Sequence, residues 1–72
     1  MMSELLDKDI IELEPSVRTY NCLKRAGIDT IGDLVKRSVN DLCHVRNMGR
    51  KSLEEIEGLL KDRGLELRKD DE

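Results

Sequence analysis

Hydrophobic residues recur along much of this chain at intervals of three and four positions, which is the spacing of helices that bury one face. Alternating strand patterns are weak, and residues that begin or end helices are frequent. The pattern predicts helices over residues 17–26, 31–37, 39–43 and 50–63. We therefore expect an all-α fold, a compact bundle of four to five short helices joined by short turns.

The polar residues between these segments support the predicted boundaries. Ser16 is suited to begin the first helix as its N-cap, and Gly27 is suited to end it. Thr30 and Asp33 have the spacing of a capping box, with aspartate in place of glutamate. Gly49 stands in a tight connection before the last helix, where it is free to adopt a positive φ.

A helical wheel divides the first predicted helix into two halves. The expected inward half carries Val17, Tyr20, Leu23 and Ala26. The expected outward half carries Arg18, Asn21, Cys22 and Arg25. This helix should therefore present a basic and polar face to solvent.

The length of 72 residues indicates one domain at most, and 38% hydrophobic residues are enough for a small core. We expect residues 7–68 to form the domain. Residues 1–6 should be an unpacked, disordered N-terminal segment, where the doubled Met1–Met2 is consistent with a start codon placed ahead of an excised fragment. Residues 69–72 should form an acidic tail.

Composition excludes several classes of function. Tyr20 is the sole aromatic residue, so a surface that stacks the bases of single-stranded nucleic acid is not expected. No apolar run approaches the length of a membrane span, and the N-terminus lacks a secretion signal. We expect the thiols of Cys22 and Cys43 to be reduced. The adjacent Cys43 and His44, even with Cys22, would supply three ligands at most, so we expect no metal and no cofactor.

The net charge of −3 conceals an uneven distribution. Residues 1–16 and 52–72 each carry −4, whereas residues 17–51 carry +5. Screening in physiological salt limits the influence of distant acidic residues to about 8 Å. The basic centre could therefore attract phosphate groups, although an ordinary solvated surface would give the same composition.

Residues 42–60 predict a short helix, a hairpin containing Gly49 and a longer helix that opens with Arg50, Lys51 and Ser52. This order resembles a helix-hairpin-helix DNA-binding motif. Backbone N–H groups at a helix start form an anion site, and the lysine and serine side chains can add hydrogen bonds to phosphate. Many inert turns share the pattern, so it does not decide the function by itself.

Three segments together resemble the C-terminal domain of the alpha subunit of bacterial RNA polymerase. They are Glu12-Leu13-Glu14-Pro15-Ser16-Val17-Arg18-Thr19-Tyr20-Asn21-Cys22-Leu23-Lys24, Ile31-Gly32-Asp33-Leu34-Val35 and Arg46-Asn47-Met48-Gly49-Arg50-Lys51-Ser52-Leu53-Glu54-Glu55-Ile56. The resemblance is collinear over residues 5–68. The hairpin Asn47-Met48-Gly49 lacks the first glycine of the usual helix-hairpin-helix, which agrees with this family.

The resemblance implies a set of DNA-binding positions: Arg18, Asn21, Cys22, Asn47, Gly49, Lys51, Ser52 and Glu55. It implies that Arg18 enters the minor groove of the A·T-rich upstream promoter element. Glu55 lies one helical turn after Lys51, so we expect its carboxylate to position the lysine rather than to touch phosphate.

The resemblance also implies protein partners. Glu12 and Glu14 match a patch facing the sigma factor, while Ser38, Asn40 and Asp41 match a variable surface facing transcription activators. The domain would be non-catalytic, and the nucleotidyltransferase activity would belong to the DNA-directed RNA polymerase to which a flexible linker joins it. We expect it in the bacterial cytoplasm, associated with the nucleoid and not with membrane.

Two alternatives remain at this stage. One is a helix-hairpin-helix domain of a DNA-repair protein, which would bind DNA without preferring A·T tracts. The other is a protein-interaction module whose basic face recognises an acidic partner.

Overall fold

Short helices dominate the computed structural model, which describes residues 2–70. In chain order they are α1 (Met2–Leu6), the 3₁₀ helix η1 (Ile10–Leu13), α2 (Val17–Arg25), α3 (Ile31–Val35), α4 (Val39–Cys43) and α5 (Arg50–Lys61). Within the described range, β-type pairing is limited to the isolated bridges Asp9–Thr30 and Ser38–Arg68. The prediction of an all-α bundle is confirmed, with helices at the four predicted positions.

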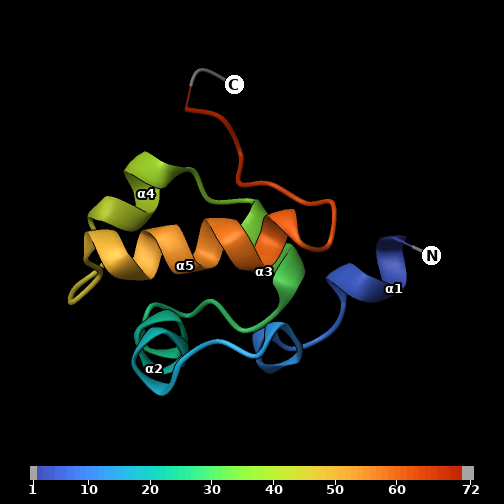
Figure 1. Cartoon of the computed structure of the whole chain (residues 1–72), viewed down its shortest axis with the longest axis horizontal. Helices are drawn as coiled ribbons and strands as arrows, with labels where there is room; N and C mark the ends of the chain where they lie inside the picture. Colours follow the sequence, from blue (N-terminus) through green and yellow to red (C-terminus); the bar gives the residue numbers. More distant parts are fainter. Residues whose placement is uncertain (1, 71–72) are drawn as a thin grey trace.

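The long helix α5 lies across the centre of the molecule (Figure 1). In that view α4 and the C-terminal segment lie on one side of α5, and α2 and η1 lie on the other. The core gathers side chains from all of these parts. It comprises Ile10, Leu13, Leu23, Ile28, Ile31, Leu34, Leu42, Ile56, Leu60 and Leu67.

The predicted helix starts are confirmed at three positions. The Ser16 hydroxyl accepts a hydrogen bond from Thr19 N, and both Thr30 and Ser38 form complete capping boxes with the residue three positions later. Short helices need such caps, because most of their first backbone N–H groups have no partner within the helix. Gly27 has a φ of 79° and ends α2 as predicted.

Gly49 does not adopt the positive φ that is open to a glycine. Gly49 is the N-cap of α5 with a φ of −103°, and the left-handed residue of this connection is Asn47, whose φ is 68°. Asparagine tolerates this conformation better than most residues because its short polar side chain can bond locally. The turn is therefore made two residues before Gly49.

The predicted wheel of α2 is wrong at two positions. Val17 is 76% exposed, whereas Cys22, expected on the outward half, is 5% exposed. The fully buried Thr19 takes the inward position near the start of the helix. A hydrophobicity wheel misses this arrangement because Thr19 is buried through polar contacts with α5.

The expectation that residues 1–6 are unpacked is wrong for the part the structure describes. Residues 2–6 form α1, and Leu5 and Leu6 pack against the core. The approach of α1 to α3 is close, because a Cβ on Gly32 would lie 2.9 Å from the Leu6 carbonyl oxygen. Met1 lies outside the described residues.

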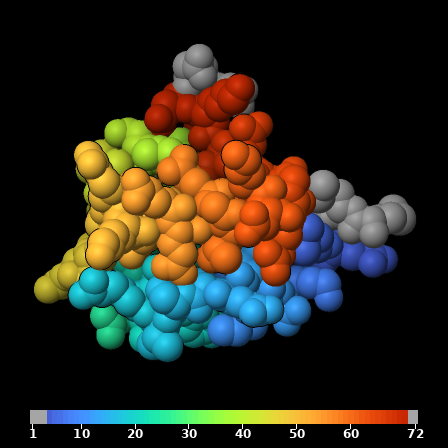
Figure 2. Space-filling model, viewed as in Figure 1, coloured from blue at the N-terminus to red at the C-terminus, as the bar shows by residue number. Residues whose placement is uncertain are grey.

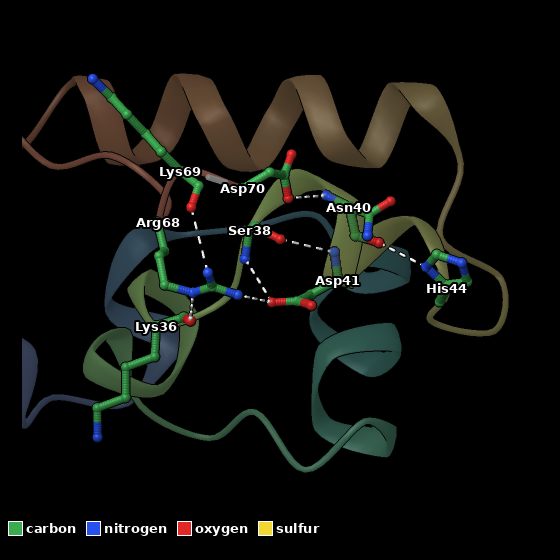
Figure 3. A network of polar contacts seen from close by, with 8 residues as sticks. All are labelled: Lys36, Ser38, Asn40, Asp41, His44, Arg68, Lys69 and Asp70. Carbon is green, nitrogen blue, oxygen red and sulfur yellow. Dashed lines mark hydrogen bonds and ion pairs between the residues drawn. The ribbon is translucent and has the colours of Figure 1, made fainter. Parts of the chain in front are cut away.

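Part of the predicted tail, residues 69–72, is hydrogen-bonded to the rest of the domain. The Arg68 guanidinium donates hydrogen bonds to the carbonyl oxygens of Lys36 and Lys69 and to the Asp41 carboxylate, at 2.9, 3.3 and 2.7 Å (Figure 3). The Asp70 carboxylate accepts from the backbone N–H of Asn40 at 3.3 Å. The bonds with Asn40 and Asp41 fasten the C-terminal segment to α4, and the bond to Lys36 fastens it to the end of α3. Residues 71–72 of the predicted tail lie outside the described residues.

Candidate nucleic-acid interface

Helix α2 and the start of α5 come together at one side of the molecule, where the cyan and yellow segments adjoin in the space-filling view (Figure 2). Between them is a depression of about 520 Å³, which we call the α2–α5 hollow. It is lined by Arg18, Asn21, Cys22, Arg25, Asn47, Gly49, Lys51 and Ser52. The structure thus assembles every residue of the predicted DNA-binding set except Glu55.

The charge of the α2–α5 hollow differs from that of three other depressions. Arg18, Arg25 and Lys51 line it, and none of its lining residues is acidic. Three other depressions on the described surface each contain at least two carboxylates. Concentrated cations without compensating acids repel one another, so the arrangement suits a bound anion.

The start of α5 adds backbone donors beside this hollow. Gly49 has no side chain with which to cap the helix, and no side-chain hydrogen bond caps this helix start. The amides of the first turn therefore retain free hydrogen-bonding capacity, at the end of the helix where the macrodipole is positive. Phosphate oxygens are suitable acceptors for such donors.

Glu55 fixes the start of α2 against α5. Its carboxylate accepts a 2.6 Å hydrogen bond from Ser16 N, and its Oε1 lies 2.9 Å from Ser16 Oγ and 2.8 Å from Thr19 Oγ1. Burial raises the pKa of Glu55, but these hydrogen bonds outweigh that effect and hold it below the ordinary value. The expected role of Glu55 in positioning Lys51 is therefore corrected, because its carboxylate holds Ser16 and Thr19.

Ser52 belongs to the same polar contact. Its side chain is buried, and its Oγ lies 3.2 Å from Thr19 Oγ1. A buried hydroxyl that contacts a neighbouring helix in this way is poorly placed to donate a hydrogen bond to a phosphate. The role left for Ser52 at the hollow is that of its backbone N–H in the first turn of α5.

Cys22 connects α2 to the loop before α5. Its thiol donates a 3.2 Å hydrogen bond to the carbonyl oxygen of Arg46. Burial raises the pKa of the Cys22 thiol, and the positive charge of Arg25 acts in the opposite direction. The thiol is therefore neutral at physiological pH and positions the loop.

The predicted protein-contact residues lie outside the hollow. Glu12 and Glu14 are exposed on and just after η1, where Glu14 adopts a left-handed conformation with a φ of 57°. Ser38 is 1% exposed because it caps α4, which is incompatible with a direct partner contact through its side chain. Asn40 is exposed and Asp41 is half-buried, so these two can contribute to a surface (Figure 3).

The cysteines and the histidine show no sign of a built metal site. Neither cysteine forms a disulfide. The His44 Nδ1 atom lies 2.8 Å from the carbonyl oxygen of Asn40. Among the described residues, no three or more His, Cys, Asp and Glu side chains are grouped to hold a metal ion. No helix in the described part of the chain has the length and apolar character to cross a membrane.

Comparison with known proteins gives a consistent picture. Residues 1–62 match the family described as the C-terminal domain of the bacterial RNA polymerase alpha chain. The chain is 56% identical over 69 residues to the DNA-directed RNA polymerase subunit alpha of Clostridium acetobutylicum, and 54% identical over 68 residues to that of Bacillus velezensis. These matches cover 96% and 94% of this chain but 22% of each relative, so the chain spans about a fifth of their length.

A solved structure agrees with the sequence relatives. The NMR structure of the C-terminal domain of the RNA polymerase alpha subunit from Helicobacter pylori superposes with a TM-score of 0.82 at 38% sequence identity. The match covers 90% of this chain and 57% of the other.

Proposed function

Because the chain belongs to the family of C-terminal domains of the bacterial RNA polymerase alpha subunit, we propose that it binds promoter DNA on behalf of the polymerase. The domain itself is non-catalytic. In this proposal it binds the minor groove of A·T-rich upstream promoter elements and provides docking surfaces for regulators.

The observation that carries the proposal is the α2–α5 hollow. Two arginines and a lysine line it and none of its lining residues is acidic, in a protein whose net charge is −3. An acidic protein gains nothing in solubility from such a cluster, whereas a phosphate backbone requires one. The feature therefore supports binding to a polyanion.

The parts of the hollow suit different roles. Arg18 is exposed on α2 and is the side chain that we assign to the minor groove, where narrow A·T tracts concentrate negative potential. Lys51 and the first-turn amides of α5 bind phosphate, and Asn21 and Asn47 add polar contacts from the two walls. Glu55, Ser52 and Cys22 act indirectly, by holding the walls in place.

The proposed partners follow from the same family relationship. A flexible linker would join this domain to the rest of the polymerase. Glu12 and Glu14 would face the sigma factor, and Asn40 and Asp41 would face activators. The separate domain would bind DNA weakly and gain effective concentration from the tether, in the bacterial cytoplasm at the nucleoid.

An NMR titration with a short A·T-rich duplex tests the DNA proposal. We expect shifts grouped at residues 18–22 and 47–55, with weaker binding when the A·T tract is replaced by G·C. Arg18→Ala should abolish specific binding, whereas Glu57→Ala, on an exposed position of α5 outside the hollow, should have little effect.

The contrary results are equally specific. Equal affinity for A·T and G·C duplexes would favour a non-selective repair-type domain. Shifts that are absent, or scattered over the surface, would favour a protein-interaction module and overturn the proposal. Comparable losses from Arg18→Ala and Glu57→Ala would show that the assigned surface is wrong.

A further inference from the structure

We propose that Arg25 and Arg46 form a second phosphate-binding site, which extends the DNA interface beyond the α2–α5 hollow. This inference rests on the proposed DNA-binding function and adds two residues to it. The site is a depression of about 640 Å³, which we call the arginine hollow. It is lined by Cys22, Arg25, Ala26, Val45, Arg46 and Asn47.

The arginine hollow is continuous with the α2–α5 hollow. Cys22, Arg25 and Asn47 line both depressions. A polyanion seated over Arg18 and Lys51 can therefore continue along the same surface, past the residues that the two depressions share. The continuation leads to Arg46, on the loop before α5.

The charge of the arginine hollow is that of an anion site. Its two ionisable cations are Arg25 and Arg46, and its lining includes no acidic residue. Together the two hollows place four cations, Arg18, Arg25, Arg46 and Lys51, around a surface without a carboxylate. Mutual repulsion among these groups is relieved when phosphates lie between them.

Neither arginine has a structural task of its own. Both side chains are exposed, and within residues 2–70 neither forms an ion pair or a side-chain hydrogen bond. Three other cations are committed: Lys24 pairs with Asp9 and Asp29, Arg63 donates to the Glu12 carbonyl oxygen, and Arg68 pairs with Asp41. The guanidinium groups of Arg25 and Arg46 are therefore free to bind a ligand.

The loop that carries Arg46 is hydrogen-bonded to α2, the helix that carries Arg25. The Cys22 thiol bonds to the carbonyl oxygen of Arg46 at 3.2 Å, and Arg25 is near enough to act on the same thiol. The loop thus cannot drift away from α2 without breaking this bond. A guanidinium presents several N–H donors in a planar fork that matches two oxygens of a phosphodiester, so two positioned arginines suit this ligand.

The salt dependence of DNA binding tests the site. We would measure the Kd of Arg25→Gln, Arg46→Gln and the double variant for an A·T-rich duplex, between about 50 and 200 mM salt. Each substitution should weaken binding about three- to tenfold and reduce the slope of log K against log salt by about 1. The preference for A·T over G·C should persist, because phosphate contacts carry no base information.

Lys61→Gln is the matched control. Lys61 is an exposed cation in a depression that shares no residue with the two hollows. Its removal changes the net charge as much as either arginine variant and should leave the slope close to that of the wild type. A slope reduced equally by Lys61→Gln would show that net charge, not a site, is responsible, and would overturn the proposal.

The outcomes separate this inference from the function on which it rests. If Arg18→Ala abolishes A·T-specific binding while the double arginine variant keeps the wild-type slope, the second site is refuted and the DNA-binding function stands. If the wild-type domain does not bind DNA, both the second site and the DNA-binding function are refuted. In the wild-type protein, the side-chain Nε–H resonances of Arg25 and Arg46 should shift during the titration, and unmoved resonances would also refute the site.

Discussion

Replacing Glu55 by alanine should both destabilise the fold and weaken DNA binding, although Glu55 does not line the α2–α5 hollow. Its carboxylate accepts from Ser16 N at 2.6 Å and lies within 2.9 Å of the hydroxyls of Ser16 and Thr19. Hydrogen bonds to a charged group contribute about 1.5–3 kcal/mol each, and the partly exposed position of Glu55 favours the lower end. Allowing for non-additivity within one network, we expect Glu55→Ala to lower the free energy of unfolding by about 2–4 kcal/mol.

Urea unfolding followed by circular dichroism measures this change. Glu54→Ala is the matched control, because Glu54 is exposed on the same helix and both variants remove the same type of side chain. It should shift the unfolding free energy by less than about 0.5 kcal/mol. A loss for Glu55→Ala no larger than that of the control would refute the reasoning.

The pH dependence offers an independent check. The pKa of Glu55 is lower in the folded protein than in the unfolded chain, because the hydrogen bonds outweigh the effect of burial. Its contribution is therefore present in full above the unfolded pKa and is lost as pH falls through the folded pKa. The stability difference between wild type and Glu55→Ala should shrink across that acidic window, and a difference independent of pH would contradict the assigned role of the carboxylate.

Three further substitutions test other parts of the fold. Asn47→Ala should destabilise the domain by about 1 kcal/mol because alanine is strained at a φ of 68°, whereas Asn47→Gly should be tolerated; equal unfolding midpoints for the two would contradict this. Ser38→Ala should cost about 1–2 kcal/mol in urea unfolding through loss of the N-cap of α4, and a neutral result would show that the cap is dispensable. Gly32→Ala places a Cβ 2.9 Å from the Leu6 carbonyl oxygen, so amide chemical shifts of α1 should change while those of α5 do not, and an unchanged α1 would refute the close approach.

Several features of the fold were accessible from local sequence. The predicted caps at Ser16 and Thr30 and the turn at Gly27 are observed, because capping depends on a side chain and a backbone group a few residues away. Apolar spacing located the four predicted helices for a related reason, since it records which face of each helix is buried. The grouping of Arg18 with Lys51 in one site came from the family resemblance rather than from either helix considered separately.

The errors in the predicted wheel of α2 arose where distant parts of the chain meet. No local pattern indicates that Thr19 is buried, because its partners Ser52 and Glu55 are more than 30 residues away. The same holds for Cys22, whose thiol bonds to the carbonyl oxygen of Arg46, 24 residues later. Val17 is apolar but exposed, so hydrophobicity alone placed it on the wrong side of α2.

By itself the sequence determined an all-α domain whose excess of positive over negative charge is confined to residues 17–51, because helix periodicity, capping and charge are properties of neighbouring residues. The tertiary structure decided which cations line the same hollow and that no acidic residue lines it with them. It also decided which polar side chains form hydrogen bonds between helices and so hold them together. Arg25 and Arg46 are far apart in the sequence, and they line one hollow at the place where a Cys22 hydrogen bond joins α2 to the loop before α5. A binding surface made by two helices depends on their packing, which is fixed by long-range contacts such as those of Glu55.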